Sequence, residues 1–389
     1  LELSDFQLNV VPGHGAGGHD IYSLQVEWPH SPKTVERTFI LKRWTPASPH
    51  SQFFGLTESY EAVAHRTGLF AALPASVHAP IVASSSDADG GGSWLLMKDV
   101  SAELDQYGRP NQFPFAQVKQ KVSIVLDRLA QMHVHFETSN YLVETLKQSR
   151  YNDCATHMST RAAAYRHALS KGATGEAVNG EVINDAFVTQ LRAFLDWLSP
   201  ELRPMWERVL VDRNDLIAAA NALPHTLLHG DLDDRNIGLS VDTGPNDASL
   251  VLIDWEWICT GPGAFDAAKP IHQLLASCTE QPELLDTYFE MLPLWGKEYA
   301  QAYQRHGGTR ASADQVLHAY HLGHVREAMS PFPHVIGSVL MAKQYEEESV
   351  NWVPSIETNK TVFDLVLAWG ERTLHYVSDY MQTHLQLGT

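Results

Sequence analysis

The sequence predicts an α+β protein in two parts, a small β-rich lobe over about residues 1–98 and a larger, mainly helical lobe over residues 99–389. Short β-rich runs fill the first part, whereas apolar residues recur at three- and four-residue steps through most of the second. Two apolar runs, at 226–228 and 250–253, interrupt the helical part as buried strands, and polar residues follow each of them. Polar groups at strand ends indicate a functional site.

Composition sets the broad class. With 44% hydrophobic and 19% charged residues, the 389-residue chain is an ordinary globular protein. No apolar run reaches the roughly 18 to 20 residues that a membrane span requires. The first residues lack the basic region and apolar stretch of a signal peptide. Three widely spaced cysteines, Cys154, Cys259 and Cys278, give neither a disulfide framework nor a zinc signature. We therefore expect a cytoplasmic protein without a membrane partner.

The net charge of -18 makes nucleic acid a poor partner, because phosphate backbones bind basic surfaces. The same negative charge is compatible with a cationic substrate.

The first two predicted strands, at 6–11 and 21–28, flank a glycine-rich segment. Its Gly15, Gly17 and Gly18 let the backbone approach a ligand closely, as a loop over phosphates must. A glycine-rich turn between strands is also typical of a simple hairpin.

The third predicted strand, at 38–44, carries Lys42 at the end of an apolar run. Strand alternation places Arg43 on the opposite face, where we expect it to be solvated. A helix predicted at 56–73 has Glu58 and Glu61 three residues apart. We expect one of these carboxylates to pair with Lys42, with Glu61 preferred.

The remaining elements follow from apolar spacing and from breaks. Strands are predicted at 80–84 and 93–97, and a strongly periodic helix at 113–136. A long insertion at 141–221 has further helical patterns and a loop at 172–180. Later helices are predicted at 284–295, 313–329 and 362–385, with breaks at 330–333 and 352–354.

The chemistry is concentrated after the two buried strands. Asp231 and Asn236 are five positions apart in a loop, the spacing of the catalytic loop in the kinase signature. In that signature the Asp accepts the substrate hydroxyl proton and the Asn holds a magnesium ion. Asp254, after the second strand, supplies a second metal-binding carboxylate.

Three motifs carry a family resemblance. His-Gly-Asp-x-x-x-x-Asn stands at 229–236, Ile-Asp-Trp-Glu at 253–256, and Gly-x-x-x-x-Asp-x-Ala at 261–268, with Asp266 at its Asp. The sequence resembles the aminoglycoside phosphotransferase and choline kinase-like group, which shares its fold with protein kinases. One departure is Asp233-Asp234-Arg235, where family members often have His-Pro-Gly.

The resemblance implies a two-lobed protein-kinase-like fold with ATP or GTP in the cleft. Lys42 then matches the strand-three lysine that pairs with the α/β-phosphates. Residues 94–100 take the place of the family's hinge, where backbone groups around Met97 and Lys98 contact the nucleotide base. His229 is interpreted as a structural residue of the loop, hydrogen-bonded to backbone.

The expected reaction is transfer of the γ-phosphoryl group of ATP or GTP to a hydroxyl of a small acceptor. Asp231 is the expected catalytic base, and Asn236 and Asp254 the expected Mg²⁺ ligands. Carboxylates around the cleft, among them Asp233 and Glu256, slightly favour an amine-bearing acceptor such as an aminoglycoside over a neutral sugar or alcohol. Asp234 and Glu346-Glu347-Glu348 belong to the same set, and Arg235 opposes it.

Two other functions remain open. A nucleotide-binding pseudokinase would have the same fold without turnover. A metal-dependent hydrolase could use His229, Asp231 and Asp254 as ligands, since His-x-Asp is a plausible metal pair.

Overall fold

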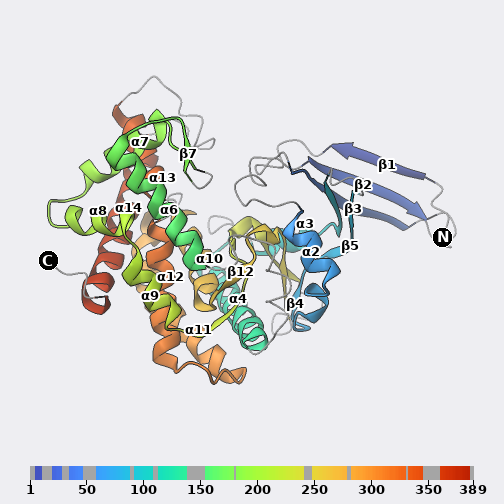
Figure 1. Cartoon of the computed structure of the whole chain (residues 1–389). Coiled ribbons are helices and arrows are strands. Elements are labelled where there is room, and N and C mark those ends of the chain that lie inside the picture. Colours follow the sequence, from blue (N-terminus) through green and yellow to red (C-terminus); the bar gives the residue numbers. More distant parts are fainter. Residues whose placement is uncertain are drawn as a thin grey trace.

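A β-sheet at one end of the molecule and a large group of helices at the other form the two parts of the chain (Figure 1). The predicted α+β architecture, with a small β-rich lobe and a larger helical lobe, is confirmed. The computed structural model describes residues 5–10, 20–28, 35–46, 58–87, 92–107, 113–137, 154–178, 181–240, 248–277, 282–329, 332–344 and 360–385.

The N-terminal sheet has five strands in the antiparallel order β1-β2-β3-β6-β5. Their bounds are Asp5–Val10 (β1), Asp20–Trp28 (β2), Val35–Trp44 (β3), Ile81–Ser86 (β5) and Ser93–Lys98 (β6). Strand β3 lies between β2 and β6, so its side chains have neighbours on both sides. Every strand predicted for this lobe is present.

Alternation along β3 separates two basic side chains. Lys42 is buried, 5% exposed. Arg43 lies on the other face, as predicted, but its guanidinium packs 5.1 Å from the ring centroid of Trp94. Trp94 is its partner in the β3–β6 register. The expectation that Arg43 is fully solvated is therefore wrong, because the neighbouring strand provides an aromatic face for the cation.

The helix predicted at 56–73 is much shorter. Within the described residues, α2 spans Tyr60–Arg66 and is followed by the 3₁₀ turn η1, Phe70–Ala72. Gly68 ends the helix with a left-handed φ of 80°, and the amide of Leu69 donates to the carbonyl of Ala64 at 2.9 Å. This is the pattern of a glycine-terminated helix. The helix therefore ends here, although apolar residues continue at helical spacing after Gly68.

The second lobe is built mainly from helices. They are α3 Ser101–Tyr107, α4 Phe115–Phe136, α6 Cys154–Lys171, α7 Asp185–Trp197, α8 Arg203–Val211, α9 Asn214–Asn221, α10 Ala264–Ser277, α11 Leu285–Arg305, α12 Ala313–Met329, α13 Phe332–Gln344 and α14 Lys360–His384. Helix α4 packs against α11 and β9, and its periodic residues, such as Val122, Leu126 and Leu129, are buried. The period of α4 is thus the one that the sequence predicted.

Helix α13 was not predicted, because Pro331 and Pro333 indicated a break. Pro333 is the second residue of α13, where a helix needs no amide donor. Gly337 of α13 contacts α7 closely enough that a Cβ would lie 2.1 Å from the carbonyl oxygen of Gln190. The loop predicted at 172–180 also contains a strand, β7 Ala177–Val178, paired with β8 Glu181–Val182.

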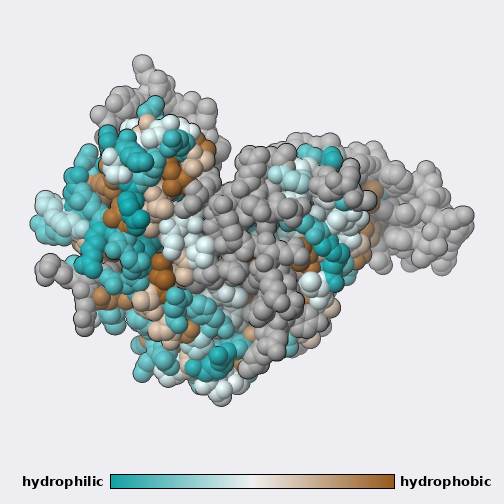
Figure 2. All heavy atoms as spheres, in the orientation of Figure 1, coloured by the Kyte–Doolittle hydropathy of each residue, from teal (hydrophilic) through white to brown (hydrophobic). Residues whose placement is uncertain are grey.

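The visible face of the helical lobe is mixed, with hydrophobic residues scattered among hydrophilic ones (Figure 2). Across the described ranges, no helix combines the length and the apolar character needed to cross a bilayer.

Candidate active site

Two short pairs of antiparallel strands bring the polar residues together. Strand β9, His225–Leu228, pairs with β12, Cys259–Pro262, and leads into residues 229–236, which we call the polar loop. Strand β10, Ile237–Ser240, leaves that loop and pairs with β11, Ser249–Leu252.

The register of β10 and β11 fixes the neighbours at their open end. Ile237 lies opposite Leu252, and the amide of Ile253 donates to the carbonyl of Asn236 at 3.1 Å. Asp254, the next residue, is therefore close to the end of the polar loop. The predicted ligands Asn236 and Asp254 come together through strand pairing, although 18 residues separate them in sequence.

Asp266 in the first turn of α10 holds the start of the polar loop. Its carboxylate accepts hydrogen bonds from the amides of His229, at 2.5 Å, and Gly230, at 3.0 Å. Burial alone would raise the pKa of Asp266, but His133 and His229 outweigh it and keep this pKa below its usual value. Gly230 has a φ of 82°, and a Cβ there would lie 2.1 Å from the carbonyl oxygen of Trp257, so glycine is required.

His229 has the structural role that the sequence predicted. It is fully buried, and its Nε2 lies 2.9 Å from the carbonyl oxygen of Ile253, to which only an N–H can donate. Its Nδ1 then accepts from the amide of Asp231 at 3.3 Å. Burial lowers the pKa of His229, which favours this neutral form. Both ring nitrogens are engaged, which argues against His229 as a metal ligand.

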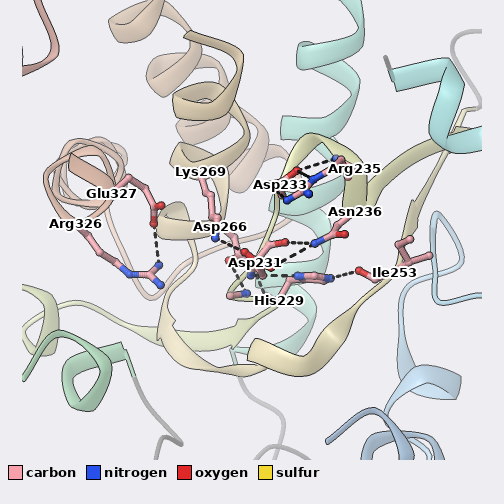
Figure 3. A network of polar contacts seen from close by, with 11 residues as sticks. His229, Asp231, Asp233, Arg235, Asn236, Ile253, Asp266, Lys269, Arg326 and Glu327 are labelled. Atoms are coloured by element: carbon pink, nitrogen blue, oxygen red, sulfur yellow. Dashed lines mark hydrogen bonds and ion pairs between the residues drawn. The ribbon is translucent and has the colours of Figure 1, made fainter. Parts of the chain in front are cut away.

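Asp231 projects from the middle of the polar loop, with its side chain 29% exposed (Figure 3). The side-chain amide of Asn236 donates to the backbone carbonyl of Asp231 at 2.9 Å, which closes the loop on itself. The same amide lies 3.5 Å from Oδ2 of Asp231. The two residues that the sequence paired by spacing are thus in direct contact.

Lys269 of α10 forms an ion pair with Oδ1 of Asp231. Sequence reasoning missed this residue, because it lies outside the motifs. A signal was present: Lys269 follows Asp266 by three residues in a helix, so both lie on the face that meets the polar loop.

Lys42 lies among three carboxylates. Its Nζ is 2.8 Å from Oε2 of Glu61 and 2.7 Å from Oδ1 of Asp254, and it also pairs with Glu256. Glu61 in turn accepts from the amide of Trp255 at 3.1 Å, which ties α2 to the residues after β11. Of the two candidate carboxylates, Glu61 on α2 is thus the partner of Lys42.

Glu58 has a different partner. Its Oε2 accepts from Nη2 of Arg66 at 2.6 Å, on the surface of the lobe.

The cluster around Lys42 carries more negative than positive charge. One ammonium faces three carboxylates, so the formal sum is -2 when all are ionised. Although burial opposes it, the charges of Asp254, Glu256 and Glu61 raise the pKa of Lys42 well above its ordinary value. Burial, together with the other two carboxylates, raises the pKa of Glu61. The raised pKa of Lys42 reflects the excess of negative charge around it.

A divalent cation would supply the missing charge. Glu61, Asp254 and Glu256 each have an oxygen within 4.8 Å of the others, and the backbone hydrogen bond from Ile253 to Asn236 brings Asn236 close to Asp254, which follows Ile253 in the chain. Carboxylate and amide oxygens are the ligands that Mg²⁺ prefers. Of the three carboxylates, that of Asp254 is the most accessible, 42% exposed. The donor set therefore fits Mg²⁺, with Asp254 as its most accessible charged ligand.

Asp254 also has an unusual backbone. Its φ of 63° and ψ of 58° are left-handed, and among the described residues no other non-glycine residue has a positive φ. Asp tolerates this conformation better than most residues, but it remains a strained one. The 3₁₀ turn η4, Trp255–Trp257, begins directly after it. This left-handed conformation turns the chain at Asp254, whose carboxylate contacts Lys42.

The remaining predicted nucleotide contacts are only partly described. Gly15, Gly17 and Gly18 lie outside the described residues. Met97 is buried and Lys98 exposed at the end of β6, where the amide of Lys98 donates to the carbonyl of Pro80 at 2.9 Å. This amide is therefore already engaged, and a base bound here would need other backbone groups. An open cavity beside this strand end is lined by Thr38, Phe39, Lys98, Asp99, Ser101 and Ala102.

No protein-family model and no curated protein matches the sequence. Solved structures do show similarity. An ethanolamine kinase from Plasmodium vivax is 12% identical with a TM-score of 0.47, over 96% of this chain and 81% of that chain. A choline/ethanolamine kinase family protein from Mesorhizobium loti is 10% identical with a TM-score of 0.47, over 99% and 92%. An aminoglycoside phosphotransferase from Streptomyces rimosus is 12% identical with a TM-score of 0.41, over 84% and 92%.

These proteins belong to the group that the sequence motifs resemble, and this chain has a two-lobed α+β architecture. At TM-scores below 0.5 the likeness carries no inference about what this chain binds or does. The function proposed below therefore depends on the chain's own residues.

Asp266→Asn should destabilise the protein by about 2–4 kcal/mol, because a buried charged acceptor of two amides is replaced by a group that presents a donor to one of them. Asp215→Asn is the matched control: Asp215 pairs with Arg208 on the surface, 56% exposed, and its replacement should cost less than about 1 kcal/mol. Urea denaturation of both variants measures the difference. Equal stability of the two variants would show that Asp266 does not hold the polar loop.

Proposed function

We propose that this protein is a small-molecule kinase that transfers the γ-phosphoryl group of ATP or GTP to a hydroxyl of a small acceptor. One observation carries the proposal: the Asp231–Asn236 loop, Asp254 and the Lys42–Glu61 pair, which come from distant parts of the chain, meet at one end of the β10–β11 pairing. Phosphoryl transfer needs this combination of a base, hard oxygen ligands and a fixed cation.

Each group has a role that its surroundings permit. Asp231 accepts the proton of the attacking hydroxyl, because its carboxylate is partly exposed and held by Asn236 and Lys269. Asn236 and Asp254 would hold Mg²⁺, which supplies charge neutralisation of the phosphates. Lys42, oriented by Glu61, binds phosphate oxygens. Catalysis is then mainly positioning and electrostatic stabilisation.

Contacts of His229 favour the kinase over a metal-dependent hydrolase. A hydrolase using His229, Asp231 and Asp254 as ligands would have to break both hydrogen bonds of the His229 ring. It would also leave the Lys42–Glu61 pair without a role. A pseudokinase lacking turnover is less favoured, because Asp231, Asn236 and Asp254 are all retained. Turnover itself decides between a kinase and a pseudokinase.

Thermal shift with Mg²⁺ alone, nucleotide alone and both together tests the proposed nucleotide site. A ligand at a hundred times its Kd stabilises by about 2.7 kcal/mol, so the shift should be large only with nucleotide present. Asp254→Ala should remove the part of the nucleotide shift that depends on Mg²⁺, because the cation loses a charged ligand. A large shift with Mg²⁺ alone would favour a hydrolase.

Asp231→Asn should lower kcat by a factor on the order of 10² to 10⁴, the scale for loss of a general base, while the nucleotide-dependent thermal shift stays close to wild type. ADP release is the measurement. Near-normal turnover in this variant would exclude Asp231 as the base.

Lys42→Ala should reduce kcat/KM for the nucleotide by roughly 10² and Glu61→Ala by roughly 10, because the first removes the cation and the second only its orientation. Glu58→Ala is the matched control, since Glu58 lies just before α2, three residues from Glu61, but pairs with the surface residue Arg66. It should leave kcat/KM within about twofold of wild type. Damage by Glu58→Ala with a silent Glu61→Ala would contradict the proposed roles.

A further inference from the structure

Lys269 lies in contact with Asp231, the proposed base, so its charge acts on any acceptor that binds there. Its ammonium contacts Oδ1 of Asp231, and its side chain is only 14% exposed (Figure 3). Asp266, three residues earlier on α10, holds the polar loop at His229 and Gly230. Lys269 is therefore fixed to the same scaffold as the proposed base, and it is not a mobile surface lysine.

Lys269 belongs to a row of alternating charges that continues into α12. Glu327 of α12 acts on Lys269 electrostatically and lies 3.5 Å from Arg326. Burial lowers the pKa of Lys269, but Asp231 and Glu327 outweigh it and raise this pKa, so Lys269 keeps its proton. Asp231, Lys269, Glu327 and Arg326 together have no net charge.

Other carboxylates near the polar loop are paired as well. Asp233 accepts from Arg235 through both oxygens, at 2.9 and 2.8 Å. Glu256 pairs with Lys42. These carboxylates formed part of the reason for expecting an amine-bearing acceptor, and Glu346-Glu347-Glu348 lies outside the described residues. Asp234 also acts electrostatically on Arg235, and the excess negative charge around Glu256 lies at the proposed Mg²⁺ site, where a divalent cation would balance it. The charged group in contact with Asp231 itself is the ammonium of Lys269.

We propose that Lys269 selects against cations, so that the acceptor is a hydroxyl compound with no positive charge near its reacting hydroxyl. This deepens the proposed kinase function and rests on it. The ammonium of Lys269 already neutralises Asp231, so a second cation close to Asp231 would be repelled by Lys269. Lys269 holds Oδ1 of Asp231, while Oδ2 lies 3.5 Å from the side-chain amide nitrogen of Asn236, so the two contacts fix the orientation of the carboxylate. Lys269 is thus a positioning and selectivity residue, and an alcohol or sugar hydroxyl is the acceptor class.

Matched acceptors that differ mainly in charge test the proposal. Choline is compared with 3,3-dimethyl-1-butanol, its uncharged isostere, and ethanolamine with ethylene glycol, by ADP release. Wild type should favour the uncharged member of each pair. Lys269→Met should raise the ratio of kcat/KM for the charged over the uncharged member at least about tenfold, because the repelling ammonium is gone.

The exposed Lys119 of α4 provides the matched control, and Lys119→Met should leave the ratio unchanged. A wild type that favours choline and ethanolamine, or an unchanged ratio in Lys269→Met, would overturn the proposal.

If none of these four acceptors is phosphorylated, hydrolysis of the nucleotide by water is measured instead, because water is itself an uncharged acceptor. Lys269→Ala should lower the rate of this hydrolysis about tenfold or more, whereas Lys269→Arg should retain most of the rate. Added ethylammonium should restore hydrolysis in Lys269→Ala but should not raise the rate of the wild type. No loss, or loss without restoration, would overturn the role of Lys269. Absence of both ADP release and a nucleotide-dependent thermal shift in wild type would instead contradict the kinase proposal itself.

Discussion

The polar loop has no regular structure before its final 3₁₀ turn, η3 (Asp234–Asn236), and its shape depends on the carboxylate of Asp266. Two consecutive amides donate to this one buried group, and they can do so only because Gly230 adopts a left-handed φ. The loop and α10 therefore form one unit. Asp231, Asn236 and Lys269 take their positions from that unit, which explains how a loop can hold side chains as accurately as a helix does.

Charge divides the site into two regions with different needs. Around Lys42, three carboxylates face one ammonium, and the excess negative charge suits a metal ion, which would offset the charge of a triphosphate. Around Asp231, Lys269 balances the charge of the base. Asn236 lies between the two regions, because its amide contacts Asp231 and its backbone pairs with Ile253.

The sequence could predict those features that depend on a local pattern of residues. Strand alternation placed Lys42 and Arg43 on opposite faces, and periodicity identified α4. Motif spacing identified the Asp231–Asn236 loop, and the usual role of a single histidine as a core residue indicated the structural role of His229. The end of α2 was missed because one φ at Gly68 overrides a long apolar pattern, and α13 because Pro333 is tolerated in a first helical turn. Glu256 as a partner of Lys42 depends on how β3 and β11 approach one another, which no local pattern records.

Lys269 shows why reaction class and acceptor class are not equally predictable. The reaction needs a fixed set of groups at fixed spacing, so a motif can identify it. The charge of an acceptor depends instead on the sum of all charges that surround the base, and that sum includes residues from α10 and α12 that no motif contains. The carboxylates counted in the sequence slightly favoured an amine, although Arg235 was already counted against them. The proposed preference for an uncharged hydroxyl compound comes from Lys269, whose contact with Asp231 no motif records.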